Sequence, residues 1–264
     1  MRANNRMSAK IMGVVNVTPD SFSDGGETFN ADDAIRRGLE FASVGVDIVD
    51  VGGESTRPGA LLIDEAEELR RIIPVVKALS SHVRVSIDTT KSEVAKRAVE
   101  VGATLINDIS ASLHPVAASM GVGWVAMHMQ GIPQTMQESP KYDNLLDNVF
   151  DFLRDRVSWA QSLGIDEVWI DPGIGFGKTF EDNLDLLAHV DRLMDIGVPV
   201  LVGTSRKTFI GKLASAREGS VSSPRDRLEG SLATVAWCYA RGVSAMRVHD
   251  VAEVLQLRAL LDLC

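Results

Sequence analysis

The sequence of 264 residues predicts a single (β/α)8 barrel of the TIM type, and three observations lead to this fold class. Eight short apolar runs alternate with longer stretches of helical periodicity along the chain. Both faces of each run are apolar, as in parallel strands that helices cover. The length suits one large domain spanning residues 1–264, and no shift of composition marks a second one. A doubly wound open sheet is the alternative.

The expected elements follow one another in regular order. Strands are expected at 11–17, 46–52, 84–89, 104–110, 123–129, 167–173, 199–205 and 245–250. Helices are expected at 31–45, 64–80, 91–102, 143–164, 181–197 and 226–242, with a weaker two-turn helix at 114–121 and a polar loop at 216–226. Glycines at 45, 102, 164, 197 and 242 are placed to end five of the helices, because a helix commonly ends in a left-handed residue.

Composition excludes several classes of function. The formal net charge of −9 argues against a general nucleic-acid binder, which needs a basic surface. No apolar run has the roughly 20 residues that cross a bilayer, and the first ten residues lack the apolar segment of a secretory signal. We therefore expect a cytoplasmic protein with no membrane or nucleic-acid partner. Residues 1–9 are expected to form a flexible extension.

Polar residues stand at the end of nearly every expected strand. They are Asn16, Asp50, Asp88, Asn107, Asp108, His128, Asp171, Ser205, Arg206, Lys207, Arg247 and His249. In a parallel barrel these ends share one rim, where ligands bind. Any single Asp or Asn is explained as a helix cap or turn residue. A polar residue inside an apolar run, however, is buried without a partner unless it faces a ligand or another polar group.

These residues are of two chemical kinds. Asp88, Asn107 and Asp171 offer carboxylates and an amide, which suit the donor and acceptor edge of a nitrogen heterocycle. The second kind offers cations and donors for phosphate, carboxylate or carbonyl oxygens: Arg57, Arg206, Lys207, Arg247 and His249. The pattern predicts one site that holds a heterocycle beside an anion.

Two glycine-rich stretches do not fit the known nucleotide motifs. In DPGIGFGKT (171–179), Gly173 and Gly177 enclose three residues where a phosphate loop has four. Phe176 in this stretch is either an apolar wall of the rim or a core residue. VGGESTRPGA (51–60) lacks the dinucleotide fingerprint. Its Thr56, Arg57 and Pro58 lie either at the site or on a solvated turn.

Eight motifs together resemble those of the dihydropteroate synthase family of pterin-binding barrels. They are NVTPDSFSDGG, DVGGESTRPGA, VSIDT, INDIS, MHMQG, IDPGIGFGK, GTSRKTFIG and RVHDV, and they touch all eight strand ends. The resemblance implies an enzyme of folate biosynthesis, a transferase, that joins 6-hydroxymethyl-7,8-dihydropterin diphosphate to 4-aminobenzoate and releases diphosphate with Mg²⁺. A methyltetrahydrofolate-dependent methyltransferase and a non-catalytic pterin-binding homologue are the alternatives.

The resemblance also implies roles for individual residues. Asp88, Asn107, Asp171 and Lys207 would hold the pterin ring, and Asp88, Asp171, Lys207, Arg247 and His249 would be catalytic. Asn16 would ligate the magnesium ion, and Arg57, Arg247 and His249 would join it at the diphosphate. The aminobenzoate side would be shaped by Phe22, Thr56, Arg57, Pro58, Phe176 and Ser205. The chemistry suggests a dissociative substitution, because a neutralised diphosphate leaves readily and the pterin shares the positive charge.

Three segments carry further expectations. The loop TPDSFSDGG, with Asp20 and Asp24 as candidate residues, should fold over the substrates. SASLHP departs from the family pattern after the fourth strand, which leaves the shape of the loop at 110–116 open. The TRPGA loop has no insertion, so sulfonamides should compete for the aminobenzoate site. A homodimer is expected through late helices such as LATVAWCYA, with burial under a neighbouring helix as the alternative.

Overall fold

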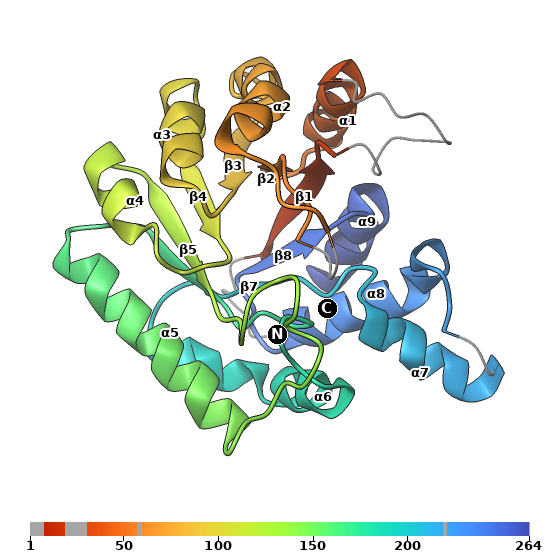
Figure 1. Cartoon of the computed structure of the whole chain (residues 1–264). Helices are drawn as coiled ribbons and strands as arrows, with labels where there is room; N and C mark the ends of the chain where they lie inside the picture. Colours follow the sequence, from red (N-terminus) through yellow and green to blue (C-terminus); the bar gives the residue numbers. More distant parts are fainter. Residues whose placement is uncertain (1–7, 19–30, 57–59, 219–220, 264) are drawn as a thin grey trace.

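Eight parallel strands form one sheet in the order β6-β5-β4-β3-β2-β1-β8-β7. The computed structural model describes residues 8–18, 31–56, 60–218 and 221–263. A parallel bridge between Ile170 and Val200 joins the two edges of the sheet, so the strands form a nearly closed barrel. The helices form a ring outside the strands (Figure 1). The structure confirms the predicted (β/α)8 barrel.

The strands are short, as is usual for the tilted strands of such a barrel. They are β1 (Lys10–Asn16), β2 (Ile48–Gly52), β3 (Arg84–Asp88), β4 (Leu105–Asp108), β5 (Gly123–Met127), β6 (Val168–Asp171), β7 (Leu201–Val202) and β8 (Ala245–Val248). The helices are α1 (Ala31–Ser43), α2 (Glu65–Leu79), α3 (Ser92–Glu100), α4 (His114–Met120), α5 (Leu145–Ser162), α6 (Phe180–Ala188), α7 (Thr208–Glu218), α8 (Leu228–Ala240) and α9 (Val251–Leu261). Two 3₁₀ helices, η2 (Val190–Ile196) and η3 (Pro224–Arg227), precede β7 and α8.

Local sequence explains where the helices begin and end. The five glycines predicted to end helices all have positive φ, between 78° and 117°. At the other end, the Asp64 side chain accepts a hydrogen bond from Glu67 N at the start of α2. Thr179 and Asp182 form a reciprocal capping box at the start of α6.

Several elements differ from the sequence analysis. The strand expected at 199–205 is shortened to β7, α7 was not delimited, and η3 lies within the expected polar loop at 216–226. The helix expected at 181–197 divides into α6 and η2, because its last turns tighten to 3₁₀ geometry before Gly197. The sequence analysis did not delimit α9, whose Val251 and Val254 are buried in the core. This helix completes the cover of β1 and β8 (Figure 1).

The core has an inner and an outer part. Met12, Ile48, Leu105, Val125, Trp169, Leu201 and Ala245 form a separate apolar cluster, with one residue from each of seven strands. This cluster, called the inner apolar layer below, fills the barrel interior. A larger cluster packs the outer face of the sheet against the helices.

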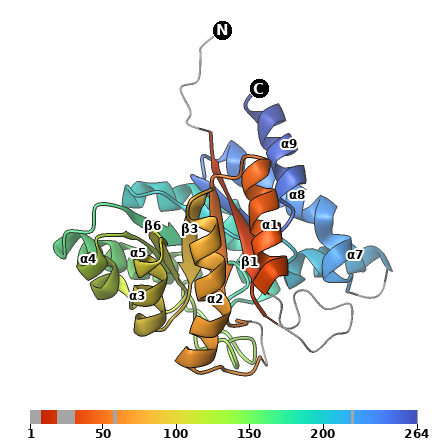
Figure 2. The same cartoon turned by 90° about the horizontal axis from the view of Figure 1, so that it is seen from above.

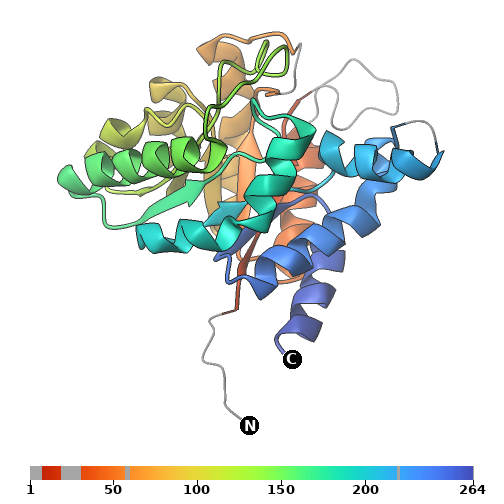
Figure 3. The same cartoon turned by 90° about the horizontal axis from the view of Figure 1, so that it is seen from below.

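The two ends of the barrel are distinct. Strand β1 begins, and α9 ends, at the same end of the barrel, whereas the loops after β2 and β5 lie at the opposite end (Figures 2 and 3). The last two residues of the predicted flexible extension contact the barrel: Ser8 Oγ donates to Asp262, and Ala9 is buried. The first seven lie outside the described residues. Within the described ranges, no helix is both long and apolar enough to cross a bilayer.

Candidate active site

A polar layer lies directly above the inner apolar layer, toward the carboxyl ends of the strands. Residues two apart on a strand point to the same face. The residue two positions after a member of the inner apolar layer therefore also faces the interior, and it lies nearer the rim. In four strands this next interior residue is polar: Asp50 follows Ile48, Asn107 follows Leu105, Asp171 follows Trp169, and Arg247 follows Ala245. Four of the polar residues predicted at strand ends therefore face into the barrel.

Strand register places a second row of residues beside this layer. Asn16 on β1 pairs in register with Gly52, Gly52 with Asp88, and Asp88 with Asn107. Gly52 is the small member of this row, and a Cβ there would lie 3.8 Å from Asn16 Oδ1 and 3.7 Å from Asp88 Oδ2. Asn16 and Asp88 therefore lie close together across Gly52.

Arg247 connects three of the strands. Its Nε donates to Asp50 Oδ2 at 2.7 Å and its Nη2 donates to Asp88 Oδ2 at 2.7 Å. Asn107 Nδ2 donates to the same Asp50 oxygen at 3.0 Å. The Asp50 carboxylate thus orients two residues that the sequence analysis assigned to ligands, although no role was assigned to Asp50 itself. Its other oxygen, Oδ1, is buried and has no hydrogen-bond partner in the described part of the chain.

Burial disfavours the charged form of both carboxylates that were predicted to contact the pterin. Burial raises the pKa of Asp88, and the neighbouring Asp50 adds to this rise, whereas Arg247 opposes it. Burial also raises the pKa of Asp171, against the opposing effects of Lys207 and the Gly173 N–H, which donates to Asp171 Oδ1 at 2.7 Å. A ligand that donates hydrogen bonds or carries positive charge would therefore stabilise the ionised form of both carboxyls.

Lys207 lies in the segment that joins β7 to α7. Its ammonium group donates to the Ile174 carbonyl and lies 4.7 Å from the centre of the Phe176 ring. Burial lowers the pKa of Lys207 to about 8, although Asp171 opposes the effect. The structure therefore brings Lys207, Asp171 and Phe176 together at the turn that follows β6.

The segments around β7 and β8 bring Ser205 and His249 together. Ser205 Oγ accepts from His249 N at 3.1 Å and lies 3.1 Å from His249 Nδ1. Arg206, grouped with the anion-binding cations by charge alone, is instead ion-paired with Asp250. Arg206 thus has a carboxylate partner within the protein, and its grouping with the anion-binding cations stays a prediction.

Comparison with known proteins identifies the family. The family described as pterin binding enzyme matches residues 12–249. Dihydropteroate synthase of Escherichia coli K12 is 42% identical over 254 residues, which cover 93% of this chain and 88% of that protein. The chain belongs to the dihydropteroate synthase family.

Solved structures of this family share the fold closely. The crystal structure of Yersinia pestis dihydropteroate synthase with a sulfonamide drug complex superposes with a TM-score of 0.89 at 39% identity, covering 97% of this chain and 94% of that one. Xanthomonas albilineans dihydropteroate synthase in complex with 7,8-dihydropteroate superposes with a TM-score of 0.85 at 40% identity, covering 97% and 93%. The match therefore spans the whole barrel.

The unusual loop of this synthase after β4 is organised by Asp108. Asp108 neighbours Asn107 on the strand and so points to the other face of the sheet. Its carboxylate accepts from Ser110 N at 2.9 Å, Ser112 N at 2.7 Å and Leu113 N at 2.6 Å, and also from Trp124 Nε1 at 3.2 Å. Asp108 is therefore a structural residue of the loop at 110–113, whereas Asn107 faces the polar layer.

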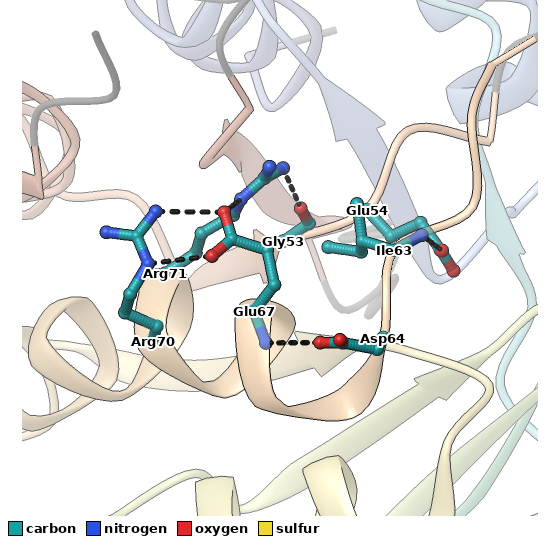
Figure 4. A network of polar contacts seen from close by, with 7 residues as sticks. All are labelled: Gly53, Glu54, Ile63, Asp64, Glu67, Arg70 and Arg71. Carbon is teal, nitrogen blue, oxygen red and sulfur yellow. Dashed lines mark hydrogen bonds and ion pairs between the residues drawn. The ribbon is translucent and has the colours of Figure 1, made fainter.

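The loop after β2 is held at its base by charged side chains (Figure 4). Glu54 Oε1 accepts from Ile63 N at 2.8 Å, so it joins the two ends of the loop. Arg71 donates to the Gly53 carbonyl at 3.0 Å and is paired with Glu67. Lys91 adds contacts to Glu54 at 2.9 Å and to the fully buried Glu68 at 2.6 Å.

Most of the predicted site residues in the loops after β1 and β2 lie outside the described residues. Thr56 is half-buried on the loop after β2, but Arg57 and Pro58 lie outside the described residues. Asp20, Phe22 and Asp24 in the loop after β1 also lie outside them. Their predicted roles in a dihydropteroate synthase stay predictions.

A magnesium ion fits the donor set of the rim only if the substrate supplies most of its ligands. The described residues contain no group of three His, Cys, Asp or Glu side chains that could hold a metal. Mg²⁺, however, commonly takes one or two protein oxygens together with phosphate oxygens and waters. The half-buried amide oxygen of Asn16, close to Asp88, suits such a site.

Proposed function

We propose that this protein joins 6-hydroxymethyl-7,8-dihydropterin diphosphate to 4-aminobenzoate, giving 7,8-dihydropteroate and diphosphate. The polar layer carries this proposal, because it places heterocycle acceptors and the half-buried cation of Arg247 on one ring of strands. The relatives reported above are synthases, and one of them binds 7,8-dihydropteroate. Both facts favour the synthase over the methyltransferase and the non-catalytic homologue.

The pterin ring binds at Asp88, Asn107, Asp171 and Lys207 in this proposal. The carboxylates accept hydrogen bonds from ring N–H and amino groups, the Asn107 amide provides both a donor and an acceptor, and Lys207 donates to ring oxygen or nitrogen. The support is their shared position on the interior face of the barrel and the burial of both carboxyls.

The diphosphate binds beside the ring. In this proposal Arg247 faces it from β8, His249 faces it from the position after β8, and Arg57 reaches it from the loop after β2. A magnesium ion held by Asn16 would supply further neutralisation of the diphosphate charge. Arg247 pairs with Asp50 and Asp88 in the free protein. When the diphosphate binds, Arg247 gives up part of this pairing and forms contacts with phosphate oxygens instead.

The aminobenzoate lies on the outer side of the pterin methylene. In this proposal Ser205 and Phe176 flank this side, together with Thr56 on the loop after β2. Phe22, Arg57 and Pro58 complete the set as proposed residues. The sulfonamide complex of the Yersinia pestis relative supports the proposal that sulfonamides compete here with 4-aminobenzoate.

The reaction proceeds by dissociative substitution. The bond between the pterin methylene carbon and the bridging oxygen breaks first, and its electron pair leaves with the diphosphate. The carbon then carries positive charge, which it shares with the pterin ring, and Asp88 and Asp171 stabilise that charge. The amine nitrogen of 4-aminobenzoate donates its lone pair to the carbon and afterwards releases one proton. No bond to the protein forms at any step.

Product formation tests the activity. Purified protein is incubated with the pterin diphosphate and 4-aminobenzoate, with and without Mg²⁺, and diphosphate and dihydropteroate are both quantified. We expect equal amounts of the two products, with no dihydropteroate when the arylamine is omitted. A protein that binds the pterin but releases no diphosphate would instead be the non-catalytic homologue.

Isotope exchange tests the order of bond breaking. Pterin diphosphate with ¹⁸O in the bridging position is incubated with the protein and a non-nucleophilic analogue of 4-aminobenzoate. Dissociation followed by rotation of the diphosphate and return should move the label to non-bridging positions. Normal turnover without any such scrambling would favour concerted displacement.

We also propose a cytoplasmic homodimer. Leu184 on α6, Leu213 on α7 and Trp237 on α8 are 37%, 48% and 45% exposed, on helices that neighbour one another (Figure 1). Light scattering coupled to size exclusion should give twice the chain mass. A monomer at micromolar concentration would contradict the dimer.

A further inference from the structure

The buried side chain of Lys178 has no place in the roles assigned so far. It is 2% exposed and lies immediately after the turn 173–177, which begins two residues beyond β6. Its ammonium group donates to the Phe176 carbonyl at 3.0 Å and lies 3.0 Å from His128 Nδ1. A longer contact of 3.4 Å reaches the His128 carbonyl. A fully buried lysine is costly, because a charged amine loses its hydration.

His128 receives the lysine in its neutral form. Burial and the adjacent Lys178 lower the pKa of His128 to about 3. The imidazole is therefore uncharged at neutral pH, and its Nδ1 accepts a hydrogen bond from Lys178, which leaves the ring proton on Nε2. Lys178 and His128 thus form a buried donor and acceptor pair between the segments that follow β5 and β6.

The turn beside Lys178 is in close contact with the loop after β5. A Cβ on Gly173 would lie 1.9 Å from the His128 carbonyl oxygen, and a Cβ on Gly177 would lie 2.3 Å from the Gln130 carbonyl oxygen. Both glycines have positive φ. The backbone of the turn therefore lies against residues 128–130, where no larger residue fits.

Side chains hold the turn from the outside as well. Gln137 donates to the Gly175 carbonyl at 2.6 Å, and Tyr142 donates to the Gly177 carbonyl at 2.7 Å. Asn183 accepts from Gly175 N at 2.5 Å. Lys178 donates to the Phe176 carbonyl, which lies between the carbonyls of Gly175 and Gly177.

This turn carries the groups that contact Lys207. The Ile174 carbonyl accepts from Lys207, and the Phe176 ring lies 4.7 Å from its ammonium group. A shift of the turn therefore shifts both contacts. Lys178 itself lies outside this set and acts on Lys207 through the backbone.

We propose that Lys178 is a positioning residue for the pterin side of the site: with His128 it fixes the Phe176 carbonyl, and thereby the turn that orients Lys207. The inference rests on the proposed function, because the role of Lys207 toward the pterin belongs to that proposal. The inference is that pterin affinity depends on a buried pair, Lys178 and His128, that does not itself contact the ligand.

Replacing the lysine tests the inference directly. In Lys178→Met we expect the dissociation constant of the unreactive ligand 6-hydroxymethylpterin, measured by calorimetry, to rise about tenfold, as for a lost hydrogen bond to a charged group. The pH at which pterin affinity falls should also move upward, because a displaced turn gives Lys207 access to water and so relieves the burial that lowers its pKa. Lys96→Met, on the exposed face of α3, is the matched control and should match the wild type.

A pair of histidine variants keeps the test valid if Lys178→Met fails to fold. The amide oxygen of Asn lies where Nδ1 of His lies, so His128→Asn keeps an acceptor for Lys178, whereas His128→Leu removes it. We expect His128→Leu to weaken pterin binding about tenfold and His128→Asn to stay within threefold of the wild type. Equal affinities for the two variants would overturn the inference.

The outcomes separate this inference from the proposed function. A wild type that makes no dihydropteroate refutes the proposed function. An active wild type with unchanged pterin affinity and pH dependence in folded Lys178→Met refutes the positioning role alone. A loss of thermal stability without either change assigns Lys178 to the core and also refutes the role.

Discussion

The two ends of the barrel both carry buried or half-buried charges, but in opposite electrostatic conditions. At the amino end, Arg84 donates to Glu167 at 2.8 and 2.6 Å, and Trp169 Nε1 donates to the same carboxylate at 2.9 Å. Burial opposes ionisation of Glu167, but Arg84 and Trp169 outweigh it, and its pKa lies below the ordinary value. The Glu167 carboxylate is therefore more stable in its charged form in the folded protein than in the unfolded chain.

At the carboxyl end, the ionised states of three groups near the site are disfavoured. Burial raises the pKa of Asp88 and Asp171 and lowers that of Lys207, and Asp50 Oδ1 lacks a partner among the described residues. Such groups cost stability in the free protein and recover it when a ligand pairs with them. The charges at the amino end are thus satisfied within the protein, whereas these groups at the carboxyl end are left for a ligand to satisfy.

The largest expected effect is the loss of the cation that joins the carboxylates. Arg247→Met leaves Asp50 and Asp88 without their shared partner and removes a proposed diphosphate ligand. We expect kcat/KM for dihydropteroate formation to fall roughly a hundredfold or more. Arg84→Met, at the amino end, is the control and should stay within twofold of the wild type. Similar losses in both variants would remove the distinction between the two ends.

Next in size is a charge at the carboxyl end that serves the structure. Lys91→Met leaves the fully buried Glu68 without its cation, which should lower the free energy of unfolding by about 3 kcal/mol. The exposed Arg97 on the same helix pairs with Glu100, and Arg97→Met should cost less than about 0.5 kcal/mol. Urea unfolding measures both values. Equal costs would show that the cluster around Lys91 contributes no more than a surface pair.

The pH dependence of Lys207 should have opposite signs for binding and for stability. With a folded pKa of about 8, its protonated fraction, and hence pterin affinity, should fall about fourfold between pH 7 and 8.5. The unfolded lysine keeps its proton to about pH 10.4. The unfolded chain therefore binds more protons in this window, so stability of the free protein should rise as the pH increases from 8 toward 10.

Calorimetric titrations and urea unfolding across this range, with Lys207→Met as control, measure the two trends. The variant should lack the contribution of Lys207 to both. Pterin affinity and stability that change in the same direction with pH in the wild type would contradict the assignment.

The smallest effect is expected for the amino-end pair itself. Because the side chains of Arg84 and Glu167 are 27% and 38% exposed, water screens their attraction. Arg84→Met should therefore lower stability by about 0.5 kcal/mol, or about 1–2 °C in melting temperature. Calorimetry would contradict this expectation if the variant melted above the wild type.

The sequence predicted the barrel and the polar rim for one physical reason. The apolar runs locate the strands and their polar ends, so Asn107, Asp171 and Arg247 could be placed on one shared rim from the pattern alone. Helix ends were equally accessible, because positive φ favours glycine so strongly. Both are local properties of the chain.

Pairing across the barrel could not be predicted in this way. Asp50 receives Asn107 from 57 residues away and Arg247 from 197 residues away, so its orienting role depends on the closed fold. Arg206 was grouped with the anion ligands by charge, but Asp250, 44 residues later, neutralises it. Lys178 was examined only as part of a phosphate-loop pattern, and no local signal marks His128 as its acceptor.

One isosteric variant tests most directly whether the charges at the carboxyl end serve a pterin ligand rather than stability. Asp171→Asn keeps the acceptor for Gly173 N and removes a buried carboxylate charge. The affinity for 6-hydroxymethylpterin and the free energy of unfolding are measured on the same preparation. We predict that pterin affinity falls at least about tenfold while stability is unchanged or higher. Unchanged affinity with reduced stability would contradict the account.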